Sequence, residues 1–202
     1  MFKQSAMELK NVRCITVTGI LIAIGVVLNT FSFFETEILK MTFGYLAIAT
    51  IGMLFGPVVA IIAAIPFDLL PAMFRGHGII FWFTIPKMIE GLIYGIFLYG
   101  CYQPNLKKDG IVKTIWSFLR IGLSRVFVVT ICYFFINSYL IFWIFSPPSS
   151  QGVPFMTWAW LRSGVKITTQ FPIDLVLMFT ILPIIKAIYN KINKRYIMRG
   201  TN

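Results

Sequence analysis

The chain has few charged residues, and acidic residues are the rarest of them. Only 12% of its 202 residues are charged and 7 of them are Asp or Glu, whereas about 25% of a soluble domain is charged. Apolar residues make up 58% of the chain and aromatic residues 16%. This composition excludes a soluble globular protein and predicts an all-α integral membrane protein. The longest polar stretches are the two termini and 103–114, so we expect a single membrane domain over residues 1–202.

The residue types that carry most enzyme and metal chemistry are also scarce. The single histidine, His77, has no metal-ligand partner at a useful spacing, and the three cysteines form no C-x-x-C pattern. The sequence contains no H-E-x-x-H motif, no G-x-S-x-G motif and no glycine-rich phosphate loop. We therefore expect no enzymatic activity, no metal and no cofactor. Without a phosphate-binding loop the chain is not expected to hydrolyse ATP itself.

The net charge of +11 has an explanation other than nucleic acid. Basic residues gather before the first apolar stretch, in the loop 107–113 and after the last apolar stretch. Basic loops mark the cytoplasmic side of membrane proteins. We therefore expect both termini and the 107–113 loop in the cytoplasm, and no nucleic-acid partner.

The apolar stretches predict six transmembrane helices. Block 43–73 is longer than one crossing needs, and Gly56-Pro57 at its centre is a typical restart point for a helix. Dividing the block there gives an even number of spans, which is required if the three basic regions share one side. The expected spans are 12–34, 43–55, 57–73, 80–102, 116–144 and 157–188.

A polar stripe runs along the last of these spans. Arg162, Lys166, Gln170 and Asp174 follow one another at four-residue steps, so they share one side of a helix. A charge at membrane depth costs about 2.5–3.5 kcal/mol on insertion scales, so such residues usually face a cavity, a partner or a ligand. Arg162 and Lys166, near the outer surface, suit an anionic ligand such as a carboxylate. The alternative is that the side chains of Arg162 and Lys166 both reach lipid headgroups. Asp174 lies two turns deeper than Lys166, a position that favours a packing or gating contact.

Three further cations lie within predicted spans. Lys87 is followed by Glu90 at i+3, a spacing that permits an ion pair within one helix. Arg120 and Arg125 fall in the cytoplasmic third of their span, where long side chains can reach the inner interface. We therefore interpret these two arginines as interfacial.

Further candidates for a ligand site lie at the outer ends of the spans. Lys40 and Arg75, on outer loops, could add to the basic surface formed by the stripe. Phe43, Trp82 and Trp158 belong to a group of aromatics that forms either an interfacial belt or the walls of a pocket for a flat ring.

Small residues recur at four-residue spacing on the first span, as Gly19-x-x-x-Ala23, and on the third, as Ala60-x-x-x-Ala64. Such pairs let two helices approach closely. Packing within the protein explains either pair, whereas a small patch that faces lipid would be a docking surface for another membrane protein.

Several strings stand in order along nearly the whole chain: Glu37-Ile38-Leu39-Lys40 before Phe43-Gly44, Gly52 to Pro57, Asp68-Leu69-Leu70, Gly91 to Gly95, and Arg162-x-x-x-Lys166 followed by Pro172-Ile173-Asp174. Together they resemble the substrate-binding S-components of energy-coupling factor (ECF) transporters, specifically the folate family.

The resemblance implies a six-helix vitamin-binding subunit in the plasma membrane of a prokaryote, with an outward-facing pocket. It also implies docking on a transmembrane coupling protein that carries two cytoplasmic ATPases, and transport by toppling in the membrane. Gly19 and Ala23 fall on the two positions of the family's A-x-x-x-A docking motif. Folate would bring two carboxylates for the cations and two rings for the aromatics.

Two departures from the family pattern fall near the expected pocket. Asn29-Thr30-Phe31 stand where members often carry an arginine, and Phe74 to Gly78 replace a proline-rich loop, so Arg75 could supply the missing cation. Alternatives therefore stay open: an S-component for another anionic vitamin such as pantothenate, a non-transporting membrane scaffold, or an ion-driven transporter that uses Lys87, Glu90 and Asp174.

Overall fold

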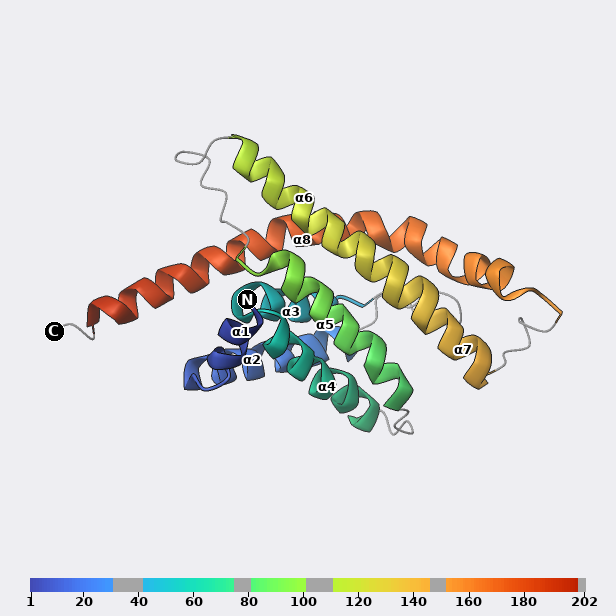
Figure 1. The fold of residues 1–202 in the computed structure, drawn as a ribbon, viewed down its shortest axis with the longest axis horizontal. Coiled ribbons are helices and arrows are strands. Elements are labelled where there is room, and N and C mark those ends of the chain that lie inside the picture. The colour runs from blue at the N-terminus through green and yellow to red at the C-terminus, as the bar shows by residue number, and fades with distance from the viewer. Residues whose placement is uncertain (31–41, 75–80, 101–110, 146–151, 200–202) are drawn as a thin grey trace.

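The computed structural model describes residues 1–30, 42–74, 81–100, 111–145 and 152–199, and every regular element in these ranges is helical. In chain order the elements are α1 (Phe2–Glu8), α2 (Val12–Thr30), α3 (Tyr45–Phe55), α4 (Pro57–Phe74), η1 (Phe81–Phe83), α5 (Thr84–Leu98), α6 (Ile111–Phe127), η2 (Val128–Asn137), α7 (Ser138–Phe145) and α8 (Phe155–Arg199). Here η1 is a 3₁₀ turn and η2 is a π-helical stretch. Because α6, η2 and α7 follow one another without a break, they form one long helix (Figure 1).

Five of the expected spans correspond to helical stretches that are long and apolar enough to cross a membrane. These are Val12–Thr30, Pro57–Phe74, Phe81–Leu98, Ile115–Ile144 and Ile167–Ile192. The remaining expected span, 43–55, corresponds to α3, which has only 11 residues. A helix of this length reaches about 16 Å and does not cross the hydrocarbon core alone. The all-helical membrane fold is confirmed, and the count of six spans stays a prediction.

The break between α3 and α4 lies at Gly56, as the sequence predicts. Gly56 has φ of +88°, a conformation that suits glycine, and Pro57 begins α4. The first amide groups of α4 find a partner far away in the sequence, because the Ser5 hydroxyl accepts from the N–H groups of Val58 at 3.1 Å and Val59 at 3.4 Å. Ser5 therefore caps α4 and holds α1 at its start.

The helices define two ends of the molecule. At one, which we call the terminal end, α4 begins beside Ser5, α5 ends, α6 begins and α8 runs to the C-terminus (Figure 1). At the other, which we call the opposite end, α4 and α7 end and α5 and α8 begin. The start of α1 and the end of α8 both lie toward the terminal end (Figure 1), and the side of the membrane on which they lie stays a prediction.

Glycines let α3, α4 and α5 approach one another closely. A Cβ atom on Gly95 would stand 2.2 Å from Pro57 Cα, one on Gly52 would stand 2.9 Å from Gly95 N, and one on Gly91 would stand 2.7 Å from the Ala60 carbonyl oxygen. These contacts run antiparallel along α4 and α5. Small residues at a helix interface of this kind are typical of membrane bundles.

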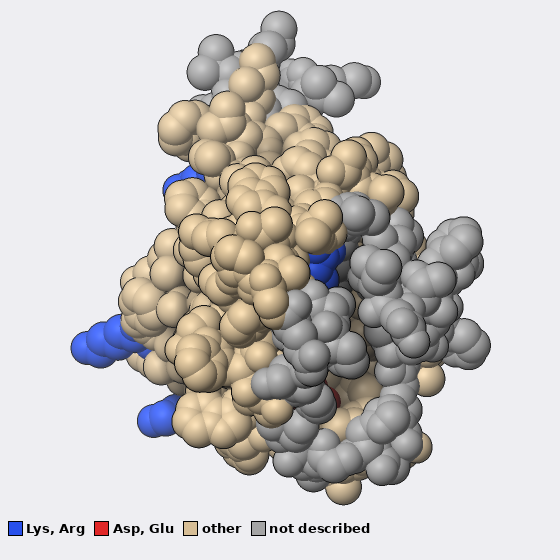
Figure 2. All heavy atoms as spheres, turned by 90° about the vertical axis from the view of Figure 1, so that its right-hand side faces the viewer, with Lys and Arg blue, Asp and Glu red and all other residues tan. Residues whose placement is uncertain are grey.

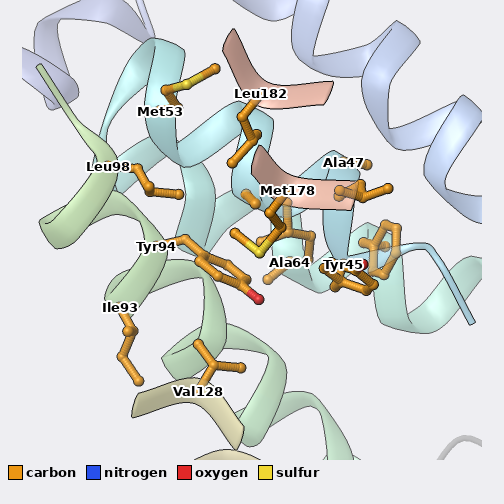
Figure 3. Close-up of a cluster of buried hydrophobic side chains, with 14 of the residues drawn as sticks. Tyr45, Ala47, Met53, Ala64, Ile93, Tyr94, Leu98, Val128, Met178 and Leu182 are labelled. Atoms are coloured by element: carbon orange, nitrogen blue, oxygen red, sulfur yellow. The ribbon is translucent and has the colours of Figure 1, made fainter. Parts of the chain in front are cut away.

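Above these three helices, an apolar core includes η2 and the middle of α8. Figure 3 shows members of this buried cluster, among them Tyr45 and Met53 from α3, Tyr94 from α5, and Met178 and Leu182 from α8. Met178 and Leu182 are fully buried. The core therefore places one face of α8 against α3 and η2.

Candidate functional site

The structure brings together two of the predicted ligand-binding residues at the start of α8. The guanidinium carbon of Arg162 lies 5.4 Å from the centre of the Trp158 ring, at a distance where a cation and an aromatic face attract each other. Trp158 is buried, and its ring meets that of Phe142 from α7 at 5.5 Å. Arg162 is only half-buried. A cation supported by an aromatic wall therefore stands at the opposite end.

The other predicted ligand-binding residues are spread around this end or lie outside the described residues. Phe43 is half-buried and packs against the core, whereas Trp82 on η1 is 61% exposed. Lys40 and Arg75 lie outside the described residues, and for Lys166 the structure describes the backbone within α8 but not the side chain. The roles of these five residues stay predictions.

Figure 2 shows the opposite end face on. Its described surface is largely uncharged, with a few basic atoms near the centre of the view. Cations at the end of a membrane protein usually face a ligand, a partner or lipid headgroups.

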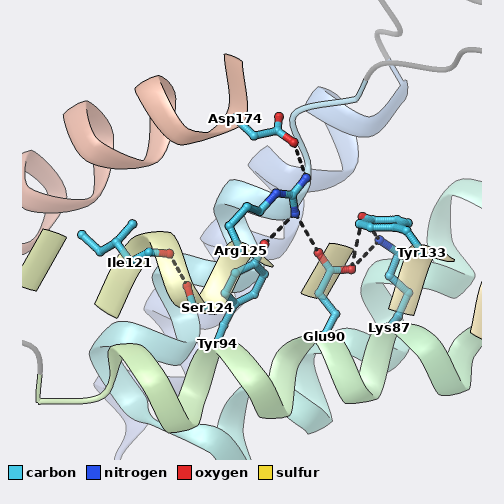
Figure 4. Close-up of polar contacts among 8 residues, drawn as sticks. All are labelled: Lys87, Glu90, Tyr94, Ile121, Ser124, Arg125, Tyr133 and Asp174. Carbon is cyan, nitrogen blue, oxygen red and sulfur yellow. Dashed lines mark hydrogen bonds and ion pairs between the residues drawn. The ribbon is translucent and has the colours of Figure 1, made fainter. Parts of the chain in front are cut away.

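Among the described residues, a group of buried charged side chains lies at the meeting of α5, α6, η2 and α8 (Figure 4). We call it the Arg125 cluster: Lys87, Glu90, Tyr94, Arg125, Tyr133 and Asp174.

Arg125 is the centre of the cluster, with a side chain that is only 1% exposed. One nitrogen of its guanidinium donates to the Asp174 carboxylate, and the other donates to the Tyr94 hydroxyl at 2.7 Å and lies 3.9 Å from Glu90 Oε1. The guanidinium also stacks on the Tyr45 ring, at 4.1 Å from its centre. Arg125 thereby joins α3, α5, α6 and α8.

Lys87 and Tyr133 extend the cluster toward the opposite end. Lys87 Nζ donates to Glu90 Oε2 at 2.8 Å and to the Tyr133 hydroxyl at 3.4 Å. The Lys87 side chain is 22% exposed, whereas that of Glu90 is 1% exposed. Two cations thus balance two carboxylates, and the chain of contacts leads from the buried Asp174 to the partly exposed Lys87.

The interpretation of Arg125 as an interfacial residue is wrong. Its side chain turns into the bundle because Asp174, Glu90 and Tyr94 offer it partners there, and a buried charge without such partners would be costly. The ion pair between Lys87 and Glu90, in contrast, is confirmed. Local spacing revealed the Lys87–Glu90 pair, whereas no local pattern joins Arg125 to Asp174, 49 positions away.

Five buried side-chain atoms in and around the Arg125 cluster have no hydrogen-bond partner within the described protein. They are Tyr45 Oη, Glu90 Oε1, Arg125 Nε, Gln170 Oε1 and Asp174 Oδ1. Buried polar atoms are nearly always paired, so such a group requires an explanation.

The predicted docking residues lie on the outer side of α2. Gly19 and Ala23 are both exposed, and a Cβ atom on Gly19 would meet nothing within 4 Å. Gly25 faces the other way, because a Cβ atom there would stand 2.5 Å from the Phe67 ring. The small pair Gly19 and Ala23 is therefore not used for packing against the described residues, while Gly25 is.

Metal chemistry finds no support in the part of the chain that the structure describes, where no three His, Cys, Asp or Glu side chains could jointly hold an ion.

The chain matches a family model and several known proteins. Residues 9–158 match the model of a family described as ECF-type riboflavin transporter, S component. Two relatives are each described as Folate transporter FolT. The one from Clostridium novyi (strain NT) is 32% identical over 121 residues, which are 59% of this chain and 65% of that protein. The one from Streptococcus mutans serotype c (strain ATCC 700610 / UA159) is 30% identical over 144 residues, which are 68% of this chain and 67% of that protein. The matched regions thus span about two thirds of these relatives.

The fold is also similar to that of a solved structure, described as FolT bound with folic acid. The TM-score is 0.64 at 25% sequence identity, and the match covers 84% of this chain and 92% of that one.

Proposed function

Because this chain belongs to the S-component family of ECF-type transporters, we propose that it binds folate at the opposite end and delivers it to an energy-coupling module. An S component is the substrate-binding part of a multi-pass membrane transporter and is not an enzyme. Both similar relatives are named folate transporters, and the similar solved structure carries folic acid.

The observation that supports folate most directly is the cation at the start of α8. Arg162 stands half-buried on the Trp158 ring, and Lys166 follows one turn deeper. Arg162 offers a planar fork that fits a carboxylate and Lys166 would offer a point charge, so the pair suits the two carboxylates of folate. Lys40 and Arg75 would add positive charge, and Phe43 and Trp82 would add aromatic surface.

Riboflavin is the second candidate, because the matching family model is described by that vitamin. Riboflavin has a flat ring but no carboxylate, so it would leave Arg162 and Lys166 without an ionic partner. Pantothenate has one carboxylate and no ring, so it would leave Trp158 without a stacking partner.

A fluorescence titration of the purified full chain against folic acid, riboflavin and pantothenate tests the proposal. The chain has 5 tryptophans, and Trp158 beside Arg162 should report ligand binding. We expect folic acid to bind most tightly. We expect the double variant Arg162→Ala/Lys166→Ala to lose about 100-fold or more in affinity, since hydrogen bonds to charged groups contribute about 1.5–3 kcal/mol each.

Arg120→Ala is the matched control, because Arg120 is a half-buried cation on α6, at the terminal end. It should bind folic acid like the wild type. Unchanged folic acid affinity in the double variant would show that Arg162 and Lys166 do not form the anion site. If riboflavin binds more tightly than folic acid, riboflavin and not folate is the ligand.

We also propose that Gly19 and Ala23 on the exposed side of α2 dock a transmembrane coupling subunit that carries two cytoplasmic ATPases. The small side chains would let a partner helix approach closely. The protein would lie in the plasma membrane of a prokaryotic cell, with six spans and the terminal end in the cytoplasm. This orientation agrees with the basic residues that gather at the terminal end.

A further inference from the structure

We propose that α1 and the end of α8 together bind the headgroups of anionic phospholipids in the leaflet at the terminal end. Exposed cations and exposed apolar side chains alternate along these two segments. We call them the basic terminal surface: Lys3, Met7 and Lys10 on and just after α1, and Ile188, Lys191 and Ile192 on α8. This lipid site is independent of the vitamin that the protein binds.

The charge of the two segments is almost entirely positive. Residues 1–13 contain three Lys or Arg, residues 184–199 contain five, and Glu8 is the one acidic residue in both ranges. The positive-inside rule explains why such residues stay on one side of a membrane, but it does not identify what they contact. Basic clusters beside a transmembrane helix attract anionic lipids, with a gain of about fivefold in affinity for each cation near the surface.

Both segments stand at the level where the hydrocarbon core of a membrane would end. The apolar stretch Val12–Thr30 begins directly after Lys10 and Asn11, and the apolar stretch Ile167–Ile192 includes Lys191 in its last turn. Lipid headgroups lie just outside the ends of such spans. A long cationic side chain at either position can therefore reach a headgroup phosphate while its stem stays on apolar surface.

α1 is held at this level and turns a mixed face outward. Its Ser5 is fully buried and caps the start of α4. Lys3, Met7 and Lys10 follow one another at steps of four and three residues and are all exposed, Met7 by 55%. The outward face of α1 thus carries an apolar side chain between two cations. This pattern is typical of helices that lie in the headgroup region.

The end of α8 presents the same mixture on the side that faces away from the bundle. Tyr189 packs inward, with the centre of its ring 5.8 Å from that of Phe55. Ile188 and Ile192, one four-residue step apart, are both exposed, and Lys191 is exposed beside them. The exposed apolar surface of α8 therefore ends next to a cation.

Beyond Ile192, α8 continues for about two turns to Arg199, so that its end projects past the other helices (Figure 1). The sequence of this extension adds Lys194, Arg195 and Arg199 and no acidic residue. The positive charge of α8 is thus concentrated directly outside its apolar span.

α1 and α8 reach this surface from neighbouring positions. Leu9, directly after α1, and Tyr189 of α8 pack against the same small core, which includes Cys14 and Phe55. The two segments therefore flank one core and can contact the same group of lipids.

A phospholipid suits this surface better than water does. Water would satisfy Lys10 and Lys191 but would leave the apolar side chains of Met7, Ile188 and Ile192 exposed, which is unfavourable. In an anionic phospholipid, the acyl chains would cover the isoleucines and the phosphate would meet the lysines. One molecule would thus satisfy both kinds of side chain.

Native mass spectrometry of the purified full chain, titrated with dioleoylphosphatidylglycerol or dioleoylphosphatidylcholine, tests the proposal. The two lipids have the same acyl chains and differ in the net charge of the headgroup. We expect the wild type to bind phosphatidylglycerol about 25-fold or more tightly than phosphatidylcholine. In Lys10→Gln/Lys191→Gln the affinity for phosphatidylglycerol should fall about 25-fold, a factor of about five for each cation, and that for phosphatidylcholine should not change.

Two companion variants separate a site from a general effect of charge. Lys10→Arg/Lys191→Arg keeps both charges and should bind phosphatidylglycerol like the wild type. Lys107→Gln/Lys108→Gln removes the same charge from a loop outside the described residues and should leave the affinity nearly unchanged. Because Lys10 and Lys191 are exposed, neither of their double variants should change the melting temperature in the absence of lipid.

An equal loss of affinity in Lys107→Gln/Lys108→Gln would assign the lipid preference to net charge and overturn the site. Equal binding of the two lipids by the wild type would also overturn it, and would leave the basic terminal surface to water or to an acidic partner protein. Neither outcome bears on the proposed binding of folate, since no vitamin is present in this assay.

Discussion

Removal of the Arg125 side chain should be the most damaging single change in the bundle. Arg125→Met keeps much of the length of the side chain but leaves Asp174 buried without a cation, and Glu90 with Lys87 alone. The loss of one partner from a buried ion pair costs about 3–5 kcal/mol. The variant also loses the 2.7 Å hydrogen bond to Tyr94. For a protein of this size, 1 kcal/mol corresponds to about 2–4 °C, so we expect the melting temperature to fall by roughly 10 °C.

The assay is thermal unfolding of the purified protein in detergent, with two companion variants. In Arg125→Met/Asp174→Leu both charges are replaced by apolar groups, a change that is often neutral at buried pairs, so at least half of the loss should be recovered. Arg120→Met, five residues earlier on the same helix, should change stability by no more than about 0.5 kcal/mol. A melting temperature of Arg125→Met equal to that of Arg120→Met would show that Arg125 is not a buried partner of Asp174.

Four further variants test the packing and docking surfaces. Gly95→Ala should destabilise the protein by about 3 kcal/mol, since the new Cβ atom would overlap the backbone of Pro57, whereas Gly19→Ala should melt like the wild type. Ser5→Ala should lower stability by about 1 kcal/mol through loss of the cap on α4, and an unchanged melting temperature would show that α1 does not hold this helix. Ala23→Leu should bind ligand normally but abolish uptake in cells that supply the coupling module, and normal uptake would exclude the docking role of α2.

The helices could largely be predicted from the sequence because apolar length and helix breakers are local properties. Gly56-Pro57 separated α3 from α4, and the ion pair between Lys87 and Glu90 followed from their spacing. The membrane fold and the S-component family were both indicated by such local strings.

The Arg125 cluster could not be predicted in this way, because it depends on how distant helices meet. Arg125 and Tyr94 are 31 positions apart in the sequence. The position of Arg125 in the cytoplasmic third of its span predicted instead that its side chain extends to the membrane interface. Only the packing of α8 over α5 and α6 shows that Asp174 lies within its reach. Likewise, four-residue spacing placed Gln170 and Asp174 on the stripe, but their unpartnered oxygens become evident only in the folded chain.

The most direct test of the central claim is equilibrium binding of labelled folic acid to the purified wild-type protein, with unlabelled folic acid, riboflavin or pantothenate as competitor. We expect saturable binding of one folic acid per chain, displaced by unlabelled folic acid and not by equal concentrations of the other two vitamins. Displacement by riboflavin at lower concentrations than by folic acid, or no saturable binding of folic acid, would contradict it.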